Sequence, residues 1–370
     1  MKKLLTILGS FTLLTIPAFS VVSCNFFNWH AGEEYNPDGI TNYLQKAKYV
    51  GDVNTQIGFF KNKDGQIQIV PFKPTTTKVP TTLPSQITSL KDAFKNLKSS
   101  YVDGIQNWDT SKITDMTSVF DTAVEFNQDI SNWNTSQVKN MNFMFTRAKK
   151  FNQHLSNWKT NNVTSMRGMF KQTEHFNGDV SKWDVSKVTD MHSMFHSTKS
   201  FDQELKDWKT ESVTDISGMF QNAERFNRDL NTWNTQKVTK MENTFQNAKE
   251  FNGELKGWKT ENVTSMKNMF TKAVKFNKDI SDWKPEKVTN MSFMFDGAEQ
   301  FNQDISKWDV SKVENVNGML RDAKAFEQDL AKWKFNKTIP SNKKYKFADG
   351  TKISSQTSKH PKWTDTPQTK

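Results

Sequence analysis

A single pattern of apolar and polar positions recurs every 25 residues over most of the chain. Residues 126–150 read FNQDISNWNTSQVKNMNFMFTRAKK, and residues 151–175 read FNQHLSNWKTNNVTSMRGMFKQTEH. Nine such repeats run from residue 101 to residue 325 without an insertion or a deletion. Phenylalanine, valine and methionine columns keep this step, as does a tryptophan column made of Trp108, Trp133, Trp158, Trp183, Trp208, Trp233, Trp258, Trp283, Trp308 and Trp333.

The constancy of these columns predicts a repeat solenoid. In a solenoid each coil buries its apolar residues only against the coils above and below it, so a column must keep its type and its phase. We therefore expect the tryptophan, phenylalanine and methionine columns to be structural core rather than a binding surface. With strands stacked about 4.8 Å apart, nine coils would form a rod of roughly 40–45 Å.

Within one coil the pattern predicts two kinds of element. Residues 138–141 (VKNM) alternate apolar and polar positions, as a short strand of a stacked parallel sheet does. Met144, Phe145 and Ala148 then have helical spacing, which predicts a short helix or 3₁₀ turn. These elements favour a leucine-rich-repeat-like coil. An all-helical solenoid is the alternative, although 25 residues is short for a pair of helices.

The segments that flank the array have other patterns. We expect residues 24–56 to be a spacer with at most a short helix over 41–48, because this stretch is polar and has no period. Residues 57–82 predict a β-hairpin around Asp64 and Gly65, followed by a Pro/Thr-rich linker. Residues 83–334 hold the array with partial capping repeats, and residues 335–370 form a basic, polar C-terminal cap or tail.

The N-terminus has the layout of an export signal. Two lysines precede an apolar run that closes on VVSC, and Cys24 is the only cysteine of the chain. A lone cysteine in an exported chain cannot form an internal disulfide. This ending resembles the lipobox of bacterial lipoproteins, in which residues 1–23 would be cleaved and Cys24 would carry a diacylglyceryl group. Because two acyl chains suffice for stable anchoring, the sequence predicts a protein lipid-anchored to the cell membrane on its extracellular face.

The formal net charge of +11 suggests an anionic partner, but the charge is unevenly distributed. Residues 101–325 hold 30 basic and 30 acidic residues, whereas residues 326–370 hold 10 and 4. A neutral array argues against the basic stripe by which a repeat protein would bind nucleic acid. Lys343, Lys344 and Lys346 could contact anionic lipid or glycans, but this composition favours a solvated tail.

Two polar columns are expected to order the turns. An asparagine column begins at Asn127 and an acidic column begins at Asp129, each with the 25-residue step. Stacked amides can bond to the backbone of the neighbouring coil and to one another. Stacked carboxylates could bind calcium, but His154 interrupts the acidic column and no second ligand accompanies it in each coil. We therefore expect turn capping and no metal site.

No set of residues predicts catalysis or a cofactor. His192 and His196 have the spacing of metal ligands on a helix, but Arg167 and Lys171 occupy the same places in the preceding coil. The sequence shows no glycine-rich phosphate loop and no nucleophile elbow. Every polar column repeats many times, whereas an active site would break the pattern locally. The sequence thus predicts a protein that is not an enzyme, with a glycan-acting enzyme as a remote alternative.

The unit FNxDxSxWxTSxVTxMxxMFxxA resembles the 25-residue repeats of the BspA-like leucine-rich-repeat surface lipoproteins of mycoplasmas, a family with a domain of unknown function. The resemblance covers about residues 83–334, and it departs at Met319 and Leu320, where the usual pair is Met-Phe. It implies a surface-exposed lipoprotein with a role in adhesion or immune interaction and with no established catalysis.

With the anchor, these features predict a surface repeat protein that contacts host proteins, extracellular-matrix proteins or glycans. A passive coat or spacer without a specific ligand is the alternative. The contact face is expected at the places that vary between coils, which include Asn134, Lys159, Asp184, Lys209 and Asn234.

Overall fold

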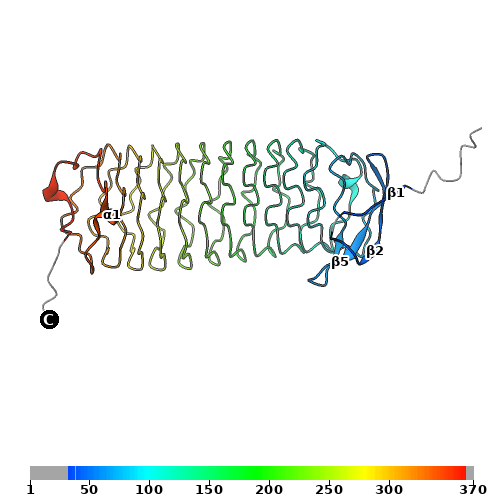
Figure 1. Ribbon diagram of the computed structural model, residues 1–370, viewed down its shortest axis with the longest axis horizontal. Coiled ribbons are helices and arrows are strands. Elements are labelled where there is room, and N and C mark those ends of the chain that lie inside the picture. The colour runs from blue at the N-terminus through cyan, green and yellow to red at the C-terminus, as the bar shows by residue number, and fades with distance from the viewer. Residues whose placement is uncertain (1–31, 38, 364–370) are drawn as a thin grey trace, which may run out of the picture.

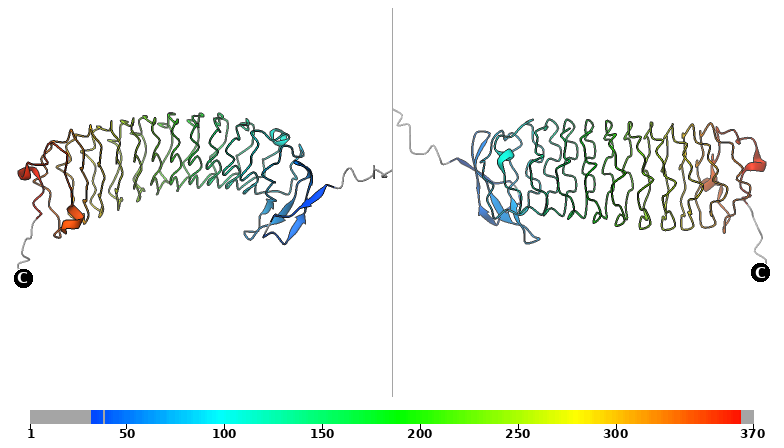
Figure 2. Two further views of the ribbon diagram at one scale, coloured as in Figure 1. Left: turned by 45° about the horizontal axis from the view of Figure 1, so that its top comes forward. Right: turned by 180° about the vertical axis from the view of Figure 1, so that it is seen from behind.

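The computed structural model describes residues 32–37 and 39–363. Between its two ends the chain winds into a row of stacked coils, and the row is gently arched (Figures 1 and 2). Within the described residues the helices are one α-helix and two 3₁₀ helices, namely α1 (Ser341–Lys344), η1 (Ile105–Asn107) and η2 (Thr357–Lys359). The all-helical alternative is therefore wrong, and no described helix has the length and apolar content to cross a membrane.

One residue of each coil forms a parallel β-bridge with the matching residue of the next coil. We call these residues the bridge row, which runs through Gln68, Ser89, Asp115, Asn140, Ser165, Asp190, Asp215, Lys240, Ser265, Asn290 and Asn315. Beside it, the N–H of Met116 donates to the carbonyl of Asn140 at 2.9 Å, and Phe120 donates to Met144 at 2.8 Å. The backbone of a coil is thus satisfied largely by its neighbours, as buried backbone groups require.

The predicted short helix or 3₁₀ turn is wrong in both forms, because the chain makes consecutive tight turns with left-handed residues there. The N–H of Met144 donates to the carbonyl of Met141 at 3.3 Å, and Ala148 donates to Phe145 at 3.0 Å. The third residues of these turns, Phe143 and Arg147, have φ values of 56° and 59°. A positive φ at that place defines a type II turn and prevents helix continuation. Every coil from residue 101 to residue 325 has such a pair of left-handed residues, four positions apart.

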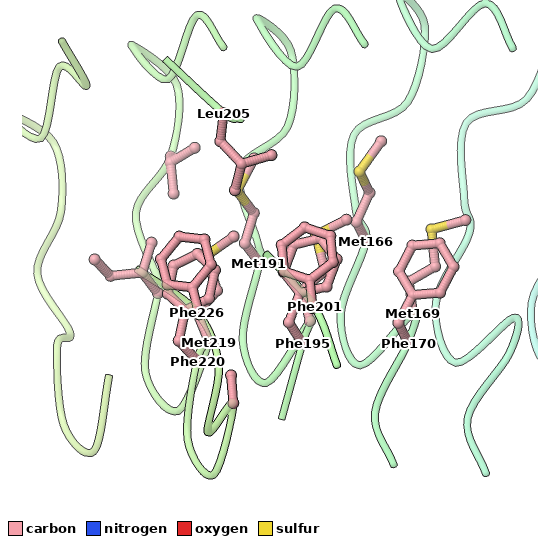
Figure 3. Close-up of a cluster of buried hydrophobic side chains, with 14 of the residues drawn as sticks. Met166, Met169, Phe170, Met191, Phe195, Phe201, Leu205, Met219, Phe220 and Phe226 are labelled. Atoms are coloured by element: carbon pink, nitrogen blue, oxygen red, sulfur yellow. The ribbon is translucent and has the colours of Figure 1, made fainter. Parts of the chain in front are cut away.

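Aromatic rings fill the interior of the stack. Eight pairs of phenylalanine rings six residues apart stack on each other, as Phe145 and Phe151 do with centroids 4.0 Å apart. Rows of these rings alternate with methionine and leucine side chains (Figure 3). The ten side chains of the tryptophan column are 2–5% exposed. Since rings of successive coils stack on one another in three columns, the core is continuous along the stack.

The arch follows from unequal spacing of the columns. Ring centroids are 5.5–5.8 Å apart along the Phe120 column and 5.8–6.1 Å apart along the Phe126 column. In seven pairs of neighbouring tryptophans that stack, the ring centroids are 6.1–6.5 Å apart. Bridged strands lie only about 4.8 Å apart. The tryptophan side is therefore the outer side of the arch and the bridge row the inner side.

The N-terminal end is an ordered cap, so the expected spacer over residues 24–56 is wrong for its described part. Six strands form two antiparallel three-stranded sheets. The first contains β1 (Glu33–Tyr35), β3 (Ala47–Val50) and β4 (Val53–Gln56), and the second contains β2 (Tyr43–Gln45), β5 (Phe59–Lys61) and β6 (Ile67–Ile69). β2 and β3 occupy the segment where a short helix was expected. These strands are too short to show a period in the sequence.

The Pro/Thr-rich segment also belongs to the stack and is not a linker. Lys78 bridges in parallel to Val53 on one side and to Asp103 on the other. Phe72 and Val79 are buried in the same core as the repeats. Proline and threonine at the remaining places suit an extended coil that needs few side chains inside.

Of the predicted cap or tail, the described part of the C-terminal end is a cap that forms a further coil, and it is not a solvated tail. The N–H groups of Val316 and Leu320 donate to the carbonyls of Lys343 and Phe347, both at 2.8 Å. These acceptors lie three residues further along the chain than the 25-residue step would place them, and α1 takes up the extra residues. Lys346 and Gly350 repeat the pair of left-handed residues, with φ values of 52° and 74°.

Candidate functional site

The predicted contact residues form an exposed row on the stack. Their side chains stand at the same place in successive coils, at Asn134, Lys159, Asp184, Lys209 and Asn234, and all five are exposed. Cys24, the predicted lipidation site, and the predicted signal segment 1–23 lie outside the described residues. The structure therefore gives the contact row a location and leaves the anchor as a prediction.

Three members of the contact row also cap a turn. The Oδ1 atoms of Asn134, Asp184 and Asn234 each accept the backbone N–H two residues further on, at 3.0–3.1 Å. Hydrogen bonds from Ser186 lower the pKa of the Asp184 carboxyl below its ordinary value. Short oxygen-bearing side chains stabilise such turns. The residue type at this place is therefore determined partly by the need to cap the turn and not only by contact with a partner.

A groove lies beside this row. Its largest hollow, of about 830 Å³, is lined by Glu211, Thr214, Asn234, Gln236, Lys237, Thr239, Asn262, Thr264 and Lys287. A second hollow of about 190 Å³ is lined by Thr289, Ser311, Lys312, Val313, Glu314, Asn336 and Lys337. Thr289 and Lys312 stand 25 residues after Thr264 and Lys287, so the same columns line both hollows. We call this surface, from Glu211 to Lys337, the polar groove.

Threonines form the floor of the polar groove. The hydroxyl groups of Thr239, Thr264 and Thr289 each donate to the carbonyl of the threonine one coil earlier, at 3.3–3.4 Å. Their backbone N–H groups donate to the same carbonyls at 3.0–3.2 Å. These donors are used inside the stack, so the floor is rigid and offers no free backbone edge to a partner strand.

The side chains that line the polar groove carry charges of both signs. Lys287 donates to Oδ1 of Asn262 at 2.7 Å, which fixes the ammonium group beside the threonine floor. Lys337 and Glu314 form an ion pair of 2.8 Å, and this pair lowers the pKa of the glutamate. The lining holds four lysines and two glutamates, so the groove is weakly positive and rich in hydrogen-bonding groups, which suits a polar or mixed-charge ligand.

A separate surface hollow, away from the polar groove, is lined by side chains that form ion pairs between coils. It measures about 560 Å³ and is lined by Asp202, Glu224, Arg225, Asn227, Lys249 and Glu250. Lys249 pairs with Glu224 at 3.3 Å across neighbouring coils. In the same column Glu174 pairs with Lys149 at 3.2 Å and with Lys199 at 3.0 Å. These charges serve the stacking of the coils.

The geometry around Ser217 does not activate a nucleophile. The Nδ1 atom of His192 lies 2.8 Å from Oγ of Ser217, but that hydroxyl donates its proton to Asp215 in a short hydrogen bond. A general base must accept the proton of the nucleophile, and here a turn carboxylate accepts it. Thr117 and Asp115 form the same contact two residues apart, at 2.6 Å, which identifies it as part of the repeat.

The two neighbouring histidines are not placed as a metal site. Burial, with Lys171 and His192 nearby, lowers the pKa of His196 to about 4. Burial and Arg167 also lower the pKa of His192. In the described part of the chain no group of three or more His, Cys, Asp or Glu residues is placed to hold a metal ion.

The asparagine and acidic columns behave as the sequence predicted. Oδ1 of Asn127 accepts the N–H of Asn152 at 2.9 Å, and the same bond recurs from coil to coil. Oδ1 of Asp129 accepts the N–H of Ser131 at 2.8 Å, and other members of the acidic column cap their turns in the same way. Both columns therefore stabilise the coils.

The repeats match the model of a known protein family. A family model described as "Mycoplasma protein of unknown function, DUF285" matches residues 88–196, 173–273 and 251–360. The chain belongs to this family. The three overlapping matches cover all nine full repeats and reach into the C-terminal cap of the DUF285 protein, and they confirm the resemblance to the mycoplasma repeat family.

Other comparisons are more distant. No curated protein matches the DUF285 chain. Among solved structures it is similar to the crystal structure of a leucine-rich cell-surface protein from Faecalibacterium prausnitzii A2-165, with 12% identity and a TM-score of 0.32. That similarity covers 78% of this chain and 93% of the other chain.

Proposed function

We propose that this DUF285 protein is a lipid-anchored, non-catalytic protein of the outer cell surface, built as a leucine-rich-type solenoid. Its polar groove contacts a host protein, an extracellular-matrix protein or a glycan. The polar groove is the observation that carries the proposal. Its floor is a row of threonines from Thr214 to Thr289 that ends at Glu314, whereas its rim changes from Glu211 to Gln236 to Ser311 at one place. A constant scaffold with a variable rim suits recognition or antigenic display.

The position of the predicted anchor supports outward display. Cys24 precedes β1 by a short stretch, and the N-terminal cap closes one end of the stack (Figure 1). A protein held by Cys24 would carry its coils away from the membrane, with the C-terminal cap at the far end. The side of the stack that bears the groove would then be accessible along much of its length.

Lipidation and display can be tested in one bacterial host that matures lipoproteins. We expect the full-length protein to incorporate an alkyne-tagged fatty acid and a Cys24→Ser variant to incorporate none. Protease added to intact cells should remove the array while cytoplasmic proteins stay whole. Labelling that persists in the variant, or an array that survives while other surface proteins are cut, would contradict the proposal.

Use of the groove can be tested by filling it. Lysine occupies the place of the threonine floor at Lys139, so the coil accepts Thr239→Lys and Thr264→Lys. Thr232 is exposed on a coil just before the tryptophan column, and Thr232→Lys is the matched control. A panel of matrix proteins and glycans should yield a ligand that the double variant loses and the control keeps. Equal binding by both variants would place the ligand elsewhere.

A passive coat or spacer is the second candidate. The ion pairs of Glu174 with Lys149 and Lys199 favour it, because they use charged side chains for stacking rather than for contact. This candidate predicts that deletion of one whole 25-residue coil leaves attachment to host cells unchanged. Loss of attachment after substitution of the groove alone would rule it out.

A further inference from the structure

The polar groove opens at its end onto the C-terminal cap. A third hollow, of about 270 Å³, is lined by Glu314, Lys337, Thr338, Ile339, Pro340 and Lys343. Glu314 and Lys337 also line the last hollow of the groove. The groove therefore continues through these two shared residues to the start of α1.

The basic excess of the chain is concentrated at this end. Residues 326–363 hold nine lysines and three acidic residues, whereas the array is neutral. Four residues that begin near the end of α1 follow one another in the chain, and the first of them lines the third hollow: Lys343, Lys344, Tyr345 and Lys346. We call them the basic cap patch. Within the described residues no ion pair involves its lysines.

The stack holds the basic cap patch in one conformation. The carbonyl groups of Lys343 and Tyr345 accept the N–H groups of Val316 and Gly318 at 2.8 and 2.9 Å. The left-handed φ of Lys346 repeats the turn found in the other coils. A backbone that is already ordered loses less entropy on binding than the backbone of a solvated tail.

The patch combines cations with an exposed aromatic ring. Tyr345 is 60% exposed, the largest value among the exposed large hydrophobic side chains of the described chain. The ammonium group of Lys346 lies 5.4 Å from the centroid of this ring, and that of Lys344 lies 5.3 Å from the ring of Trp363. Lys343 and Lys346 are exposed. An aromatic face can pack on the C–H face of a sugar ring while lysines pair with anionic substituents.

We propose that the basic cap patch and the adjoining end of the polar groove bind a sulfated polysaccharide. The lysines pair with sulfate groups, Tyr345 packs against a sugar ring, and the polymer continues along the threonine floor. This inference specifies the partner class of the proposed surface function for one end of the stack. It holds for the purified protein whether or not Cys24 is lipidated.

Two other anionic partners fit the geometry less well. An acidic peptide commonly binds by adding a strand to a sheet edge, but the N–H groups of the groove floor are already bonded between coils. A flat anionic membrane would need an outward-facing patch. The patch begins on α1, which lies on the inner, lower side of the arch in the left view of Figure 2. A chain-like ligand can follow a concave groove, and a bilayer cannot.

The test measures binding of heparin fragments, as a defined sulfated polysaccharide, to the full-length protein in mild detergent. The test variant combines Lys343→Gln, Lys344→Gln and Lys346→Gln. The matched control combines Lys182→Gln, Lys206→Gln and Lys307→Gln, three exposed lysines that form no ion pair and stand just before the tryptophan column on the outer side of the arch. Thermal unfolding of every variant checks that the fold is kept.

We expect the cap variant to lose at least tenfold in heparin affinity and the control to lose less than twofold. Replacement of the same cap lysines by arginine should keep the affinity, and Tyr345→Ala should weaken binding without changing its salt dependence. Equal losses in cap and control variants would overturn the proposal, as would equal binding of desulfated heparin. Tighter binding of phosphatidylserine mixed micelles than of heparin would assign the patch to lipid instead. A failed lipidation experiment would leave all of these outcomes unchanged.

Discussion

The indole Nε1 of Trp183 donates a hydrogen bond of 2.9 Å to the backbone carbonyl of Leu155, 28 residues earlier. Its ring also stacks on that of Trp158, with centroids 6.3 Å apart. The same indole bond recurs at each of the ten tryptophans of the column. Each tryptophan thus links two coils both by packing and by a buried hydrogen bond.

We expect Trp183→Phe to lower the free energy of unfolding by about 2 kcal/mol, because it removes a buried hydrogen bond and part of the ring area. Trp183→Ala should cost about 3–5 kcal/mol, since it also leaves a cavity. Urea unfolding at 25 °C measures both values. Lys182→Ala, at the exposed neighbour, is the control and should stay within about 0.5 kcal/mol of the unchanged protein.

The sequence predicted the core of the coils because burial acts on every repeat in the same way. Trp133, Phe145 and Val138 each belong to a column whose type cannot change without opening a gap against both neighbours. The bonding of Asn127 was predictable for a similar reason, since an amide at a fixed place can serve the same backbone group in every coil. The indole bond of the tryptophans left no separate signal, because packing alone explains a tryptophan column.

The short helix was predicted wrongly because spacing does not report the sign of φ. Met144, Phe145 and Ala148 point into the core both in a helix and in consecutive turns. Glycine and asparagine are frequent at the two left-handed places, as at Gly168 and Asn222, and this was the available signal. This signal is weak, because other coils have residues such as Phe143 and Arg147 at the same places, and these residues do not favour a positive φ.

The two ends were misjudged because their coils do not keep the 25-residue step. Phe347 accepts a backbone hydrogen bond from Leu320 only after the three extra residues of the last coil, so it stands outside the 25-residue columns. At the other end, strands such as β3 pair mostly with one another and carry no repeat. Ala47 and Tyr49 on β3 are nevertheless buried in the continuous core.

Gln172 tests the requirement for left-handed residues. Its φ is 60°, and its side chain forms no hydrogen bond with any residue that the structure describes. A β-branched residue resists this conformation, so Gln172→Val should lower the free energy of unfolding by about 1–2 kcal/mol. Gln172→Gly should be neutral or slightly stabilising, because Gly297 occupies the same place in a later coil. Equal effects of valine and glycine in urea unfolding would show that the turn is not the constraint.

Stability should depend on the protonation of His196. Its pKa is about 4 in the folded protein, because of burial and of Lys171 and His192 nearby, and about 6.5 in an unfolded chain. Between these values the unfolded chain binds more protons than the folded one. The free energy of unfolding should therefore fall as the pH drops from about 6.5 to about 4, by about 1–2 kcal/mol after allowance for partial exposure.

Urea unfolding at several pH values measures this slope. Glutamine occupies the same place at Gln221 in the next coil, so His196→Gln is a conservative control. It should flatten the slope in this pH range. Part of the slope should remain, because the pKa of His192 is also lowered. A slope identical to that of the unchanged protein would assign the pH dependence to other groups.

Glu174 tests the ion pairs that link three coils. Its carboxylate lies 3.0 Å from Lys199 and 3.2 Å from Lys149, and these lysines lower its pKa. Glu174→Gln should reduce the free energy of unfolding by less than about 1 kcal/mol, because the pairs are partly exposed. The loss should be present at pH 7, where the unfolded carboxyl is also ionised, and should vanish as the pH falls through the lowered pKa of the folded carboxyl.

Ionic strength separates this effect from a change in packing. Added salt screens exposed charges, so the difference between Glu174→Gln and the unchanged protein should shrink in about 1 M sodium chloride, where the Debye length is about 3 Å. Glu224 is the matched control, since it pairs with Lys249 alone, at 3.3 Å. Glu224→Gln should have a smaller effect with the same dependence on salt. A difference that persists in high salt would mean that Glu174 stabilises the stack by packing, and the alternating charges of this column would then have no part in aligning the coils.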